Sequence, residues 1–572
     1  MHVYSKLALT ILTFISYATS YAQSTPQNLN TYSKNGQPLY IEGYIPHPQA
    51  PENAVRKVYL LIEKGIIKRK SFSPFSVSSS TRKITEKNYG SLLLSSGFID
   101  LHGHLKYNVI PLWREAHGQF GNRFDWRSNS SYKKNVTSYL NNDALGDNTD
   151  PNSLYCQTYH YAEIKALIGG VTSVQGLGQD TNCTAGLLAR NVEIASDYDE
   201  TTGIRVSSEM INPSSTNYLQ NTVFPEIIIN TKSIDSIYTE KIAMASATAT
   251  TIPSAFKSFM ELRSNYLKYF SRIIPVGDIR GFIAHLAEGR SLDSYNKLEY
   301  KIARATGLAQ KGLIIVHGVG LDDQDLKHAS ENNISIVWSP FSNLLLYGQT
   351  LNVTQALAHG INISLGADWS PSGSKNLLDE VKIAKKYLTL SSQSISDRKL
   401  YEMMTTNPAK ALKLENKLGR IEENYLADIV AFKLKSFRKN PYTQIVDSNP
   451  SDIQLVMVGG EINIAKERFL KNSKNAEYIL SSDEIEKHND CKPYQLTQFS
   501  NKSIRYSDLT DHLKAVFPVF DTPTSCNDDY YKKSTANISE LIHNGQISTN
   551  DTENERKFDI LQKQIERITP VR

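Results

Sequence analysis

The stretch Gly97-Phe-Ile-Asp-Leu-His-Gly-His104 is the clearest indication of the fold in the sequence. Its first half is apolar and suits a buried strand, so we predict a strand that ends at the histidines. Side chains at positions i and i+2 leave a strand on the same face, so His102 and His104 can converge on one metal ion. Two histidines at this spacing also arise by chance, and the pair alone is a weak indication of a metal site.

From this stretch onward, predicted strands alternate with predicted helices along the chain. Apolar runs rich in Ile and Val alternate with helix-like segments such as 159–168 and 322–331; the runs lie at 97–101, 171–174, 281–284, 313–316, 334–338 and 361–365. Alternating units over about 300 residues suit a (β/α)8 barrel, which typically needs roughly 250. We expect the third and fourth strands at 203–207 and 226–229.

Short strand patterns return at both ends of this region, at 58–67 around a turn at Gly65 and at 427–461. They predict a small β-sandwich domain built from N- and C-terminal segments. We therefore expect an α/β chain with a TIM barrel, in this order: signal peptide 1–22, first part of the sandwich 23–95, barrel 96–412, second part of the sandwich 413–470, and a polar, partly helical extension 471–572.

The first residues resemble an export signal. Lys6 precedes an apolar run, Leu7 to Ala18, and small residues at Ser20 and Ala22 suit cleavage after Ala22. The alternative is a membrane anchor, but a run of about a dozen residues is too short to span a bilayer comfortably. We expect a periplasmic or secreted protein without stable membrane insertion after the signal is removed.

Export to an oxidising compartment favours disulfides among the four cysteines. Their proximity in the sequence favours Cys156–Cys183 and Cys491–Cys526. Four buried free thiols are the alternative.

The composition excludes several classes of protein. The 572 residues are 40% hydrophobic, with 63 basic and 58 acidic residues and a net charge of +5, and the mean hydropathy is -0.38. Neither wholesale disorder nor a polytopic membrane protein fits these values. No long basic block is present, so nucleic acid is not an expected partner. We expect a small-molecule substrate, and a homo-oligomer is compatible with the sequence.

Three further motifs place chemically active side chains at the ends of predicted strands. His285-Leu-Ala-Glu288, His317-Gly and Asp368 each follow an apolar run. Each is weak alone, because Glu288 could be a carboxylate at a helix N-terminus and Asp368 a cap. Catalytic residues of such barrels come from the carboxyl ends of several strands, and all of these candidates lie there.

Together these motifs resemble the amidohydrolase superfamily, in particular its cytosine-deaminase-like and triazine-hydrolase-like branch. The tail Asn407-Pro-Ala-Lys-Ala-Leu with Ala427-Asp-Ile-Val is part of the likeness. Trp338-Ser-Pro-Phe-Ser-Asn343, Leu346-Tyr-Gly-Gln-Thr350 and the segment after Asp368 look like a subgroup of amidohydrolases without an assigned substrate. Phe341 stands where that subgroup leads us to expect Arg.

The resemblance implies a role for each residue. His102, His104, His285 and Asp368 would hold one divalent metal ion, with zinc expected and iron or manganese as alternatives. Asp368 would also accept the proton of the attacking water, His317 would polarise the substrate, and Glu288 would protonate the leaving nitrogen. Substrate contacts are expected from Tyr107, Asn108 and Asn343.

The expected activity is metal-dependent hydrolysis of a carbon–nitrogen bond other than a peptide bond, by deamination or ring hydrolysis of a small cyclic amidine or lactam. One alternative is a binuclear peptidase or lactonase-type hydrolase, for which Lys232 is a poorly placed candidate as the bridging carboxylated lysine. The other alternative is a barrel that binds a ligand without turnover.

Overall fold

The structure is a computed structural model. It describes residues 37–47, 54–140, 143–147, 150–176, 183, 188–193, 282–293, 296–297, 299–300, 303–304, 309–470, 476–479, 495–497, 506–517, 520–521 and 529–546. Several predictions lie outside these residues: the signal peptide, the strand candidates 203–207 and 226–229, Lys232, Cys491 and Cys526.

Seven parallel strands form the centre of the described fold. One sheet has the order β6-β7-β8 and the other β12-β11-β10-β9, and all neighbours within each are parallel. The strands are β6 (Phe98–Asp100), β7 (Val171–Val174), β8 (Arg190–Asn191), β9 (Phe282–Leu286), β10 (Leu313–His317), β11 (Ser335–Trp338) and β12 (Ile363–Leu365). Parallel strands joined by helices confirm the predicted α/β class.

The side chains of β10 show why these short strands are apolar throughout. Leu313 and Ile315 belong to the large core that includes the surrounding helices. Ile314 and Val316 belong to a separate core, which also contains Ile283 of β9 and inward-facing residues of β6 and β11. Successive side chains alternate between the two faces of a strand, so both faces of this sheet are buried.

The first and last parallel strands of the chain meet at their ends. Gly103, after β6, and Asp368, after β12, form a parallel bridge. The Asp368 N–H donates to the His102 carbonyl over 2.9 Å, and the His104 N–H donates to the Asp368 carbonyl over 3.3 Å. The arrangement is TIM-barrel-like, and the bridge joins the two segments that carry the predicted metal ligands.

A short strand lies beside β7, on the side away from β6. It is β8, Arg190–Asn191, and the strand candidate at 203–207 lies outside the described residues. This strand is two residues long and polar, so it has no apolar run that a sequence pattern could reveal. Arg190 is nevertheless buried, because its guanidinium pairs with Asp428 over 2.7 and 2.9 Å.

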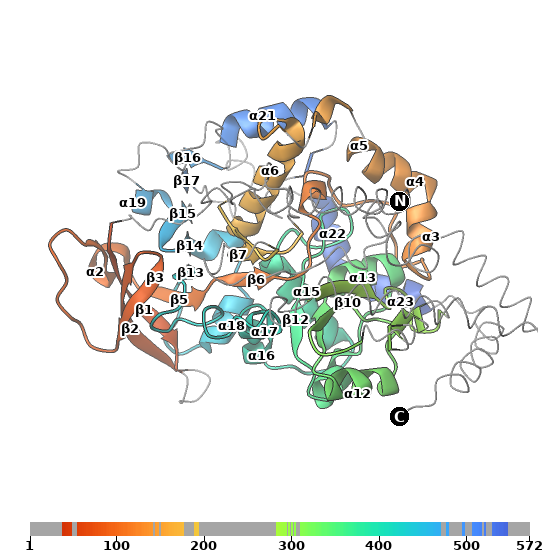
Figure 1. Cartoon of the computed structure of the whole chain (residues 1–572), viewed down its shortest axis with the longest axis horizontal. Coiled ribbons are helices and arrows are strands. Elements are labelled where there is room, and N and C mark those ends of the chain that lie inside the picture. Colours follow the sequence, from red (N-terminus) through yellow and green to blue (C-terminus); the bar gives the residue numbers. More distant parts are fainter. Residues whose placement is uncertain are drawn as a thin grey trace, which may run out of the picture. The chain divides into compact units, whose positions relative to one another are not determined.

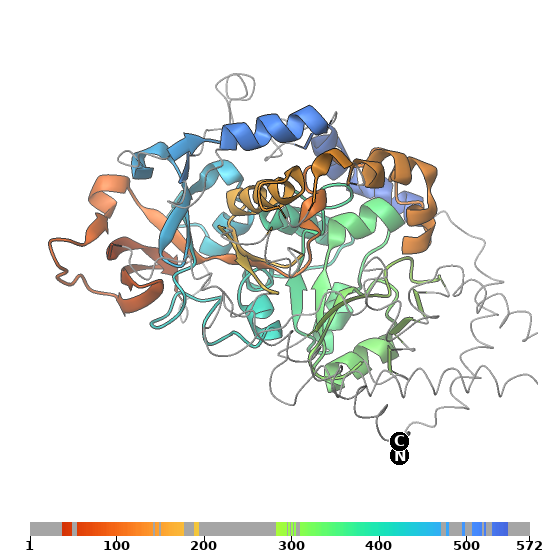
Figure 2. The same cartoon turned by 45° about the horizontal axis from the view of Figure 1, so that its top comes forward.

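A third sheet combines N-terminal and C-terminal strands of the described chain. Its order is β16-β17-β15-β14-β13-β5-β1-β2-β3, with β4 beside β1, so N-terminal and C-terminal strands lie side by side (Figures 1 and 2). The strands are β1 (Leu39–Pro46), β2 (Val55–Glu63), β3 (Ile66–Ser71), β4 (Arg82–Ile84), β5 (Leu92–Ser96), β13 (Ile429–Lys433), β14 (Ile453–Val458), β15 (Glu461–Ala465), β16 (Ala476–Tyr478) and β17 (Gln495–Thr497). The sheet continues past residue 470 into the predicted extension.

Helices connect and cover the parallel strands. Helix α6 links β6 to β7 and begins at the Ser153 cap, whose hydroxyl accepts from the Cys156 N–H. The longer helices are α6 (Leu154–Ile168), α12 (Asp323–Glu331), α13 (Pro340–Tyr347), α14 (Val353–Ala358), α15 (Leu377–Leu390), α16 (Asp397–Glu402), α17 (Thr406–Ala411) and α18 (Pro441–Val446). Short helical turns lie at α2 (Glu86–Tyr89), α3 (Arg123–Ser128), α4 (Ser130–Tyr132), α5 (Ser138–Leu140) and α19 (Glu467–Leu470).

The C-terminal extension adds three helices: α21 (Tyr506–Val516), α22 (Asp529–Ala536) and α23 (Ile538–Gln546). Helix α21 packs against α6 (Figure 2), and α23 packs against α13. Among the described residues, no helix combines the length and apolar character needed to cross a bilayer.

Candidate active site

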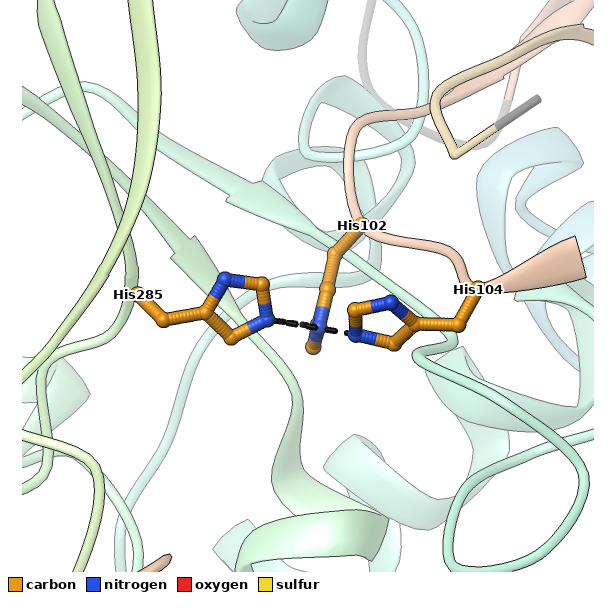
Figure 3. Close-up of side chains that lie close together, drawn as sticks. All are labelled: His102, His104 and His285. Carbon is orange, nitrogen blue, oxygen red and sulfur yellow. Dashed lines mark hydrogen bonds between the residues drawn. The ribbon is translucent and has the colours of Figure 1, made fainter. Parts of the chain in front are cut away.

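Three histidines point their rings at one another (Figure 3). His102 and His104 follow β6, and His285 is the penultimate residue of β9. The Nε2 atom of His285 lies 3.1 Å from Nε2 of His102 and 3.3 Å from Nε2 of His104. The two segments are far apart in the sequence, and the fold brings them together at the carboxyl ends of parallel strands, as predicted.

The spacing of these nitrogens fits a shared cation. An ion about 2.0–2.1 Å from two nitrogens in tetrahedral geometry holds them roughly 3.3 Å apart. A proton on His285 Nε2 could serve only one of the two neighbouring nitrogens. Burial also lowers the pKa of His102 to about 3 and that of His285 well below its usual value, so both rings are neutral and offer lone pairs. The three histidines could therefore hold a divalent metal.

Asp368 provides an oxygen to the same cluster. Its Oδ1 lies 3.2 Å from Nε2 of His102 and 3.6 Å from Nε2 of His104. Burial raises the pKa of Asp368 to about 6, although the nearby His104 and His317 oppose this shift. The backbone of Asp368 has a φ of 64°, a strained conformation for a residue with a side chain, and such strain often marks functional sites.

The hydrogen-bond partner of His102 fixes its ring orientation. Nδ1 of His102 lies 2.7 Å from the Ser339 hydroxyl, and both residues are fully buried. Bonds of this kind, behind a metal ligand, set the tautomer so that the other nitrogen faces the metal. Ser339 lies inside the motif that begins at Trp338, but no pattern in the sequence indicates its contact with His102.

Glu288 and His317 form a second group beside the histidines. Nε2 of His317 lies 3.7 Å from Oε2 of Glu288. His317 has a φ of 72°, which interrupts the alternation of β10 at its last residue and lets its side chain reach Glu288. Glu288 lies in an irregular segment, so the alternative interpretation as a helix N-terminal carboxylate has no support in the structure.

Tyr347 and Arg123 hold Glu288 in place. The Tyr347 hydroxyl donates to Oε1 of Glu288 over 2.7 Å and accepts from Nε1 of Trp126 over 2.8 Å. The Arg123 guanidinium lies 3.8 Å from Oε2 of Glu288 and also pairs with Glu299. Burial would raise the pKa of Glu288, but His317, Arg123 and the Tyr347 hydrogen bond outweigh it, so the pKa is lowered.

Asn343 lies behind His317, where it fixes the ring. Its Oδ1 accepts from Nδ1 of His317 over 2.7 Å, and its Nδ2 donates to the Thr350 hydroxyl over 3.0 Å. Asn343 is fully buried, and its expected contact with substrate stays a prediction. Because Nδ1 of His317 carries the hydrogen, Nε2 faces the site with a lone pair and would polarise a substrate oxygen only after taking up a proton.

The other two expected substrate contacts lie over the same end of the strands. The ring of Tyr107 contacts Trp369 with centroids 4.9 Å apart, and Trp369 contacts His104 at 5.6 Å. Asn108 instead uses its side-chain oxygen to accept from the Ser370 N–H over 2.8 Å. Trp369 directly follows the predicted ligand Asp368, and its place beside the histidines was not predicted from the sequence.

A family model described as the amidohydrolase family matches residues 93–462. The match covers all of the described parallel strands and the six residues of the site. The chain belongs to the amidohydrolase family. The resemblance inferred from the motifs is thereby confirmed.

Curated relatives of this amidohydrolase include two 5-methylthioadenosine/S-adenosylhomocysteine deaminases. The protein from Caldicellulosiruptor saccharolyticus is 29% identical over 222 residues, 35% of this chain and 52% of the relative. The protein from Pyrococcus furiosus is 31% identical over 195 residues, 32% of this chain and 46% of the relative. The chain thus spans about half the length of the curated relatives it matches.

Solved structures with a similar fold include two zinc-containing proteins. Atrazine chlorohydrolase from Arthrobacter aurescens, complexed with zinc, aligns with a TM-score of 0.55 at 14% identity, over 84% of this chain and 99% of that one. An adenosine deaminase from Xanthomonas campestris, with bound zinc, aligns with a TM-score of 0.53 at 15% identity, over 84% and 97%. At these identities the likeness supports the TIM-barrel-like fold of the amidohydrolase.

Two further predictions about the amidohydrolase concern residues near the site. Cys156 and Cys183 form a disulfide, as proposed from their proximity. Phe341, which stands where Arg was expected, is fully buried, and its ring meets Tyr531 with centroids 5.5 Å apart. Tyr531 belongs to helix α22, so the extension covers this position.

Proposed function

We propose that this amidohydrolase hydrolyses a carbon–nitrogen bond, other than a peptide bond, in a small cyclic amidine or lactam. The observation that carries the proposal is the meeting of two groups at one strand end. The Nε2 atoms of His102 and His104 lie within 3.3 Å of His285 Nε2, and the Glu288–His317 pair lies beside them. The first group suits a metal and the second suits proton transfer.

We infer that the site holds one divalent ion, with zinc as the expected metal and iron or manganese as alternatives. His102, His104 and His285 would hold it, with Asp368 as the oxygen ligand. Zinc is present in the related atrazine chlorohydrolase and adenosine deaminase structures, which favours this choice. When bound, such an ion lowers the pKa of water and polarises the bond to be cleaved.

Asp368 is suited to accept a proton from the attacking water. Its carboxylate is buried, and its pKa is raised to about 6 by that burial, which brings it near the range where a general base works best. The bridge to Gly103 holds its backbone beside the two histidines that follow β6. The same bridge limits how far its carboxylate can move during the reaction.

Glu288 is suited to carry that proton to the leaving nitrogen. Its pKa is lowered by His317, Arg123 and Tyr347 despite burial, so the resting side chain is ionised. Glu288 therefore has to accept a proton before it can donate one. His317, 3.7 Å away, can accept a proton at Nε2 and then polarise a developing oxyanion.

The deaminase names of the curated relatives support an amino group on a heterocyclic ring as the leaving group. The shared region covers about half of those relatives, so the substrate itself is part of the proposal. A planar ring also suits the aromatic side chains near the site, since Trp369 contacts both His104 and Tyr107.

We also propose that the parallel strands belong to a closed eight-stranded barrel. The bridge between the ends of β6 and β12 supports closure between these two strands. The two-layered sandwich and export to the periplasm or medium remain proposals from the sequence. The disulfide Cys156–Cys183 is in keeping with an oxidising compartment.

The test combines metal analysis with an assay for released ammonia. Purified protein should contain about one metal ion per chain and should release ammonia from a member of a panel of purines, pyrimidines, triazines and imidazolones. His285→Ala should lose the metal and at least about 10³-fold of the rate, because the site loses the ligand that faces both other histidines. His359→Ala is the matched control, since His359 pairs with Asp323 at the surface.

Full metal content and activity in His285→Ala would refute the assignment. About two metals per chain would favour the binuclear hydrolase instead. Metal binding without hydrolysis of any member of the panel would favour a barrel that only binds a ligand.

A further inference from the structure

One carboxylate of the C-terminal extension lies among residues of the barrel. Asp521 accepts from two buried lysines: Lys165 of α6, and Lys375, whose Nζ lies 2.6 Å from Oδ1 of Asp521. All three side chains are more than nine-tenths buried. Charged groups are costly to bury unless they are paired, so this cluster is a built feature of the fold.

The cluster also ties together two loops. Nζ of Lys165 donates to the Asn108 carbonyl over 2.7 Å and to the Ser370 hydroxyl over 2.8 Å. The Asp521 N–H donates to the Val109 carbonyl over 2.8 Å. Asn108 and Ser370 are themselves joined, because Oδ1 of Asn108 accepts from the Ser370 N–H.

These loops directly follow the metal-ligand candidates. Asn108 is four positions after His104, and Ser370 is two positions after Asp368. Asp368 has a positive φ, and a strained backbone of this kind persists only when its surroundings hold it. The turn that follows Asp368 is held at two points: Ser370 accepts from Lys165, and Lys375 donates to Asp521.

We propose that Asp521 is a positioning residue for the active site. Through Lys165 and Lys375 its carboxylate holds the loop after Asp368 against the loop after His104. The catalytic site of this amidohydrolase is thus completed by its C-terminal extension. The inference rests on the proposed function, in which Asp368 accepts a proton from the attacking water.

The extension is attached to the barrel at other points that do not reach these loops. Nζ of Lys386, on α15, donates to the carbonyls of Thr535 and Ala536 over 3.0 and 2.8 Å. A variant at Lys386 therefore weakens the attachment of the extension while leaving the Asp521 cluster intact. It provides a matched control for general loosening of the extension.

The decisive variant is Asp521→Asn in the full chain, compared with Lys386→Met. Hydrogen exchange followed by mass spectrometry should show at least about tenfold faster exchange in segments 105–112 and 368–376 of Asp521→Asn. Without the ion pairs of Asp521, these two loops are no longer held together and open more often. Lys386→Met should leave both segments unchanged. Unchanged exchange in a folded Asp521→Asn protein would overturn the proposal, whatever the substrate proves to be.

The values of kcat and KM show whether Asp521 positions the active site or only stabilises the fold in general. With any substrate found in the ammonia screen, Asp521→Asn should lower kcat about tenfold or more and change KM less than about threefold, since small misplacements of reacting groups cost rate rather than binding. Equal loss of kcat in Lys386→Met would contradict the proposal. Absence of any substrate would count against the proposed function and leave the exchange result standing.

Two measurements cover the case in which Asp521→Asn does not fold. The double variant Asp521→Asn with Lys375→Met removes one positive and one negative charge together, and it should fold with the same rapid exchange in 368–376. In the wild-type protein, amine acetylation should modify exposed Lys327 at least about tenfold faster than Lys165 and Lys375. Rapid acetylation of Lys165 and Lys375 would show that the cluster does not form.

Discussion

The two groups of the site are held in different ways. The proposed metal-binding group, His102, His104 and His285, consists of residues at strand ends whose nitrogens face one another. The proposed proton-transfer group, Glu288 and His317, is held from behind by side chains of other elements: Tyr347, Arg123 and Asn343. Strand geometry brings the first group together, with one supporting bond between Ser339 and His102, whereas the second group depends on a wider hydrogen-bond network.

The variant Glu288→Gln should distinguish the roles of the two groups most clearly. The amide cannot shuttle a proton, so the rate should fall about 10²- to 10⁴-fold, while the metal content stays near one per chain. Elemental analysis and the ammonia assay measure the two quantities on the same sample. Loss of the metal in this variant would instead assign Glu288 to the metal-binding group.

A smaller loss of reaction rate is expected when His317 loses its hydrogen bond to Asn343. Asn343→Leu keeps a similar volume but removes the acceptor for Nδ1 of His317, so the ring can turn and change its tautomer. We expect a rate lower by about 10- to 100-fold, in line with other residues behind a catalytic site, with the metal retained. A rate equal to that of the wild type would show that His317 needs no such support.

Removal of the Tyr347 hydroxyl should cause a still smaller loss of reaction rate. Tyr347→Phe deletes the hydrogen bond to Glu288 and should lower kcat about three- to tenfold and stability by about 1 kcal/mol. Tyr300→Phe is the control, because its hydroxyl bonds His328 on helix α12. Chemical denaturation and kinetics on both variants would show whether the rate effect is confined to Tyr347.

The last effect concerns stability without metal and involves no change in rate. Burial raises the pKa of Asp368 to about 6, so ionised Asp368 opposes folding above that pH, and the penalty disappears as the pH falls toward the unfolded value of about 4. Asp368→Asn should therefore stabilise the metal-free protein by about 1–3 kcal/mol at pH 7.5 and by much less at pH 4.5. Denaturation in chelator at both pH values tests the sign, and destabilisation at pH 7.5 would contradict it.

The contrast between the two groups also explains what could be predicted from sequence. His102, His104, His285 and Asp368 follow apolar runs, so local pattern and strand geometry were enough to place them together. Arg123 and Tyr347 could not be predicted, because Arg123 lies on a short helix between β6 and α6 and Tyr347 at the end of α13. Only the folded arrangement brings them to Glu288.

Two features of the structure could not be predicted from the sequence. The hydrogen bonds of Asn343 to His317 and Thr350 were not expected, because a motif names a residue but not the direction of its side chain. Strand β8 consists of the polar residues Arg190 and Asn191, so no apolar run indicates it. Its burial depends on the ion pair with Asp428, a contact over a long sequence separation.

The pairing of β5 with β13 has a consequence for how the chain is made. A ribosome-bound intermediate that ends before Ile429 lacks the neighbour of β5 and exposes an unpaired strand edge, a template for aggregation. Contacts between such distant residues also form slowly. Biogenesis of this protein should therefore depend on holding the nascent chain apart from its copies until translation is nearly complete.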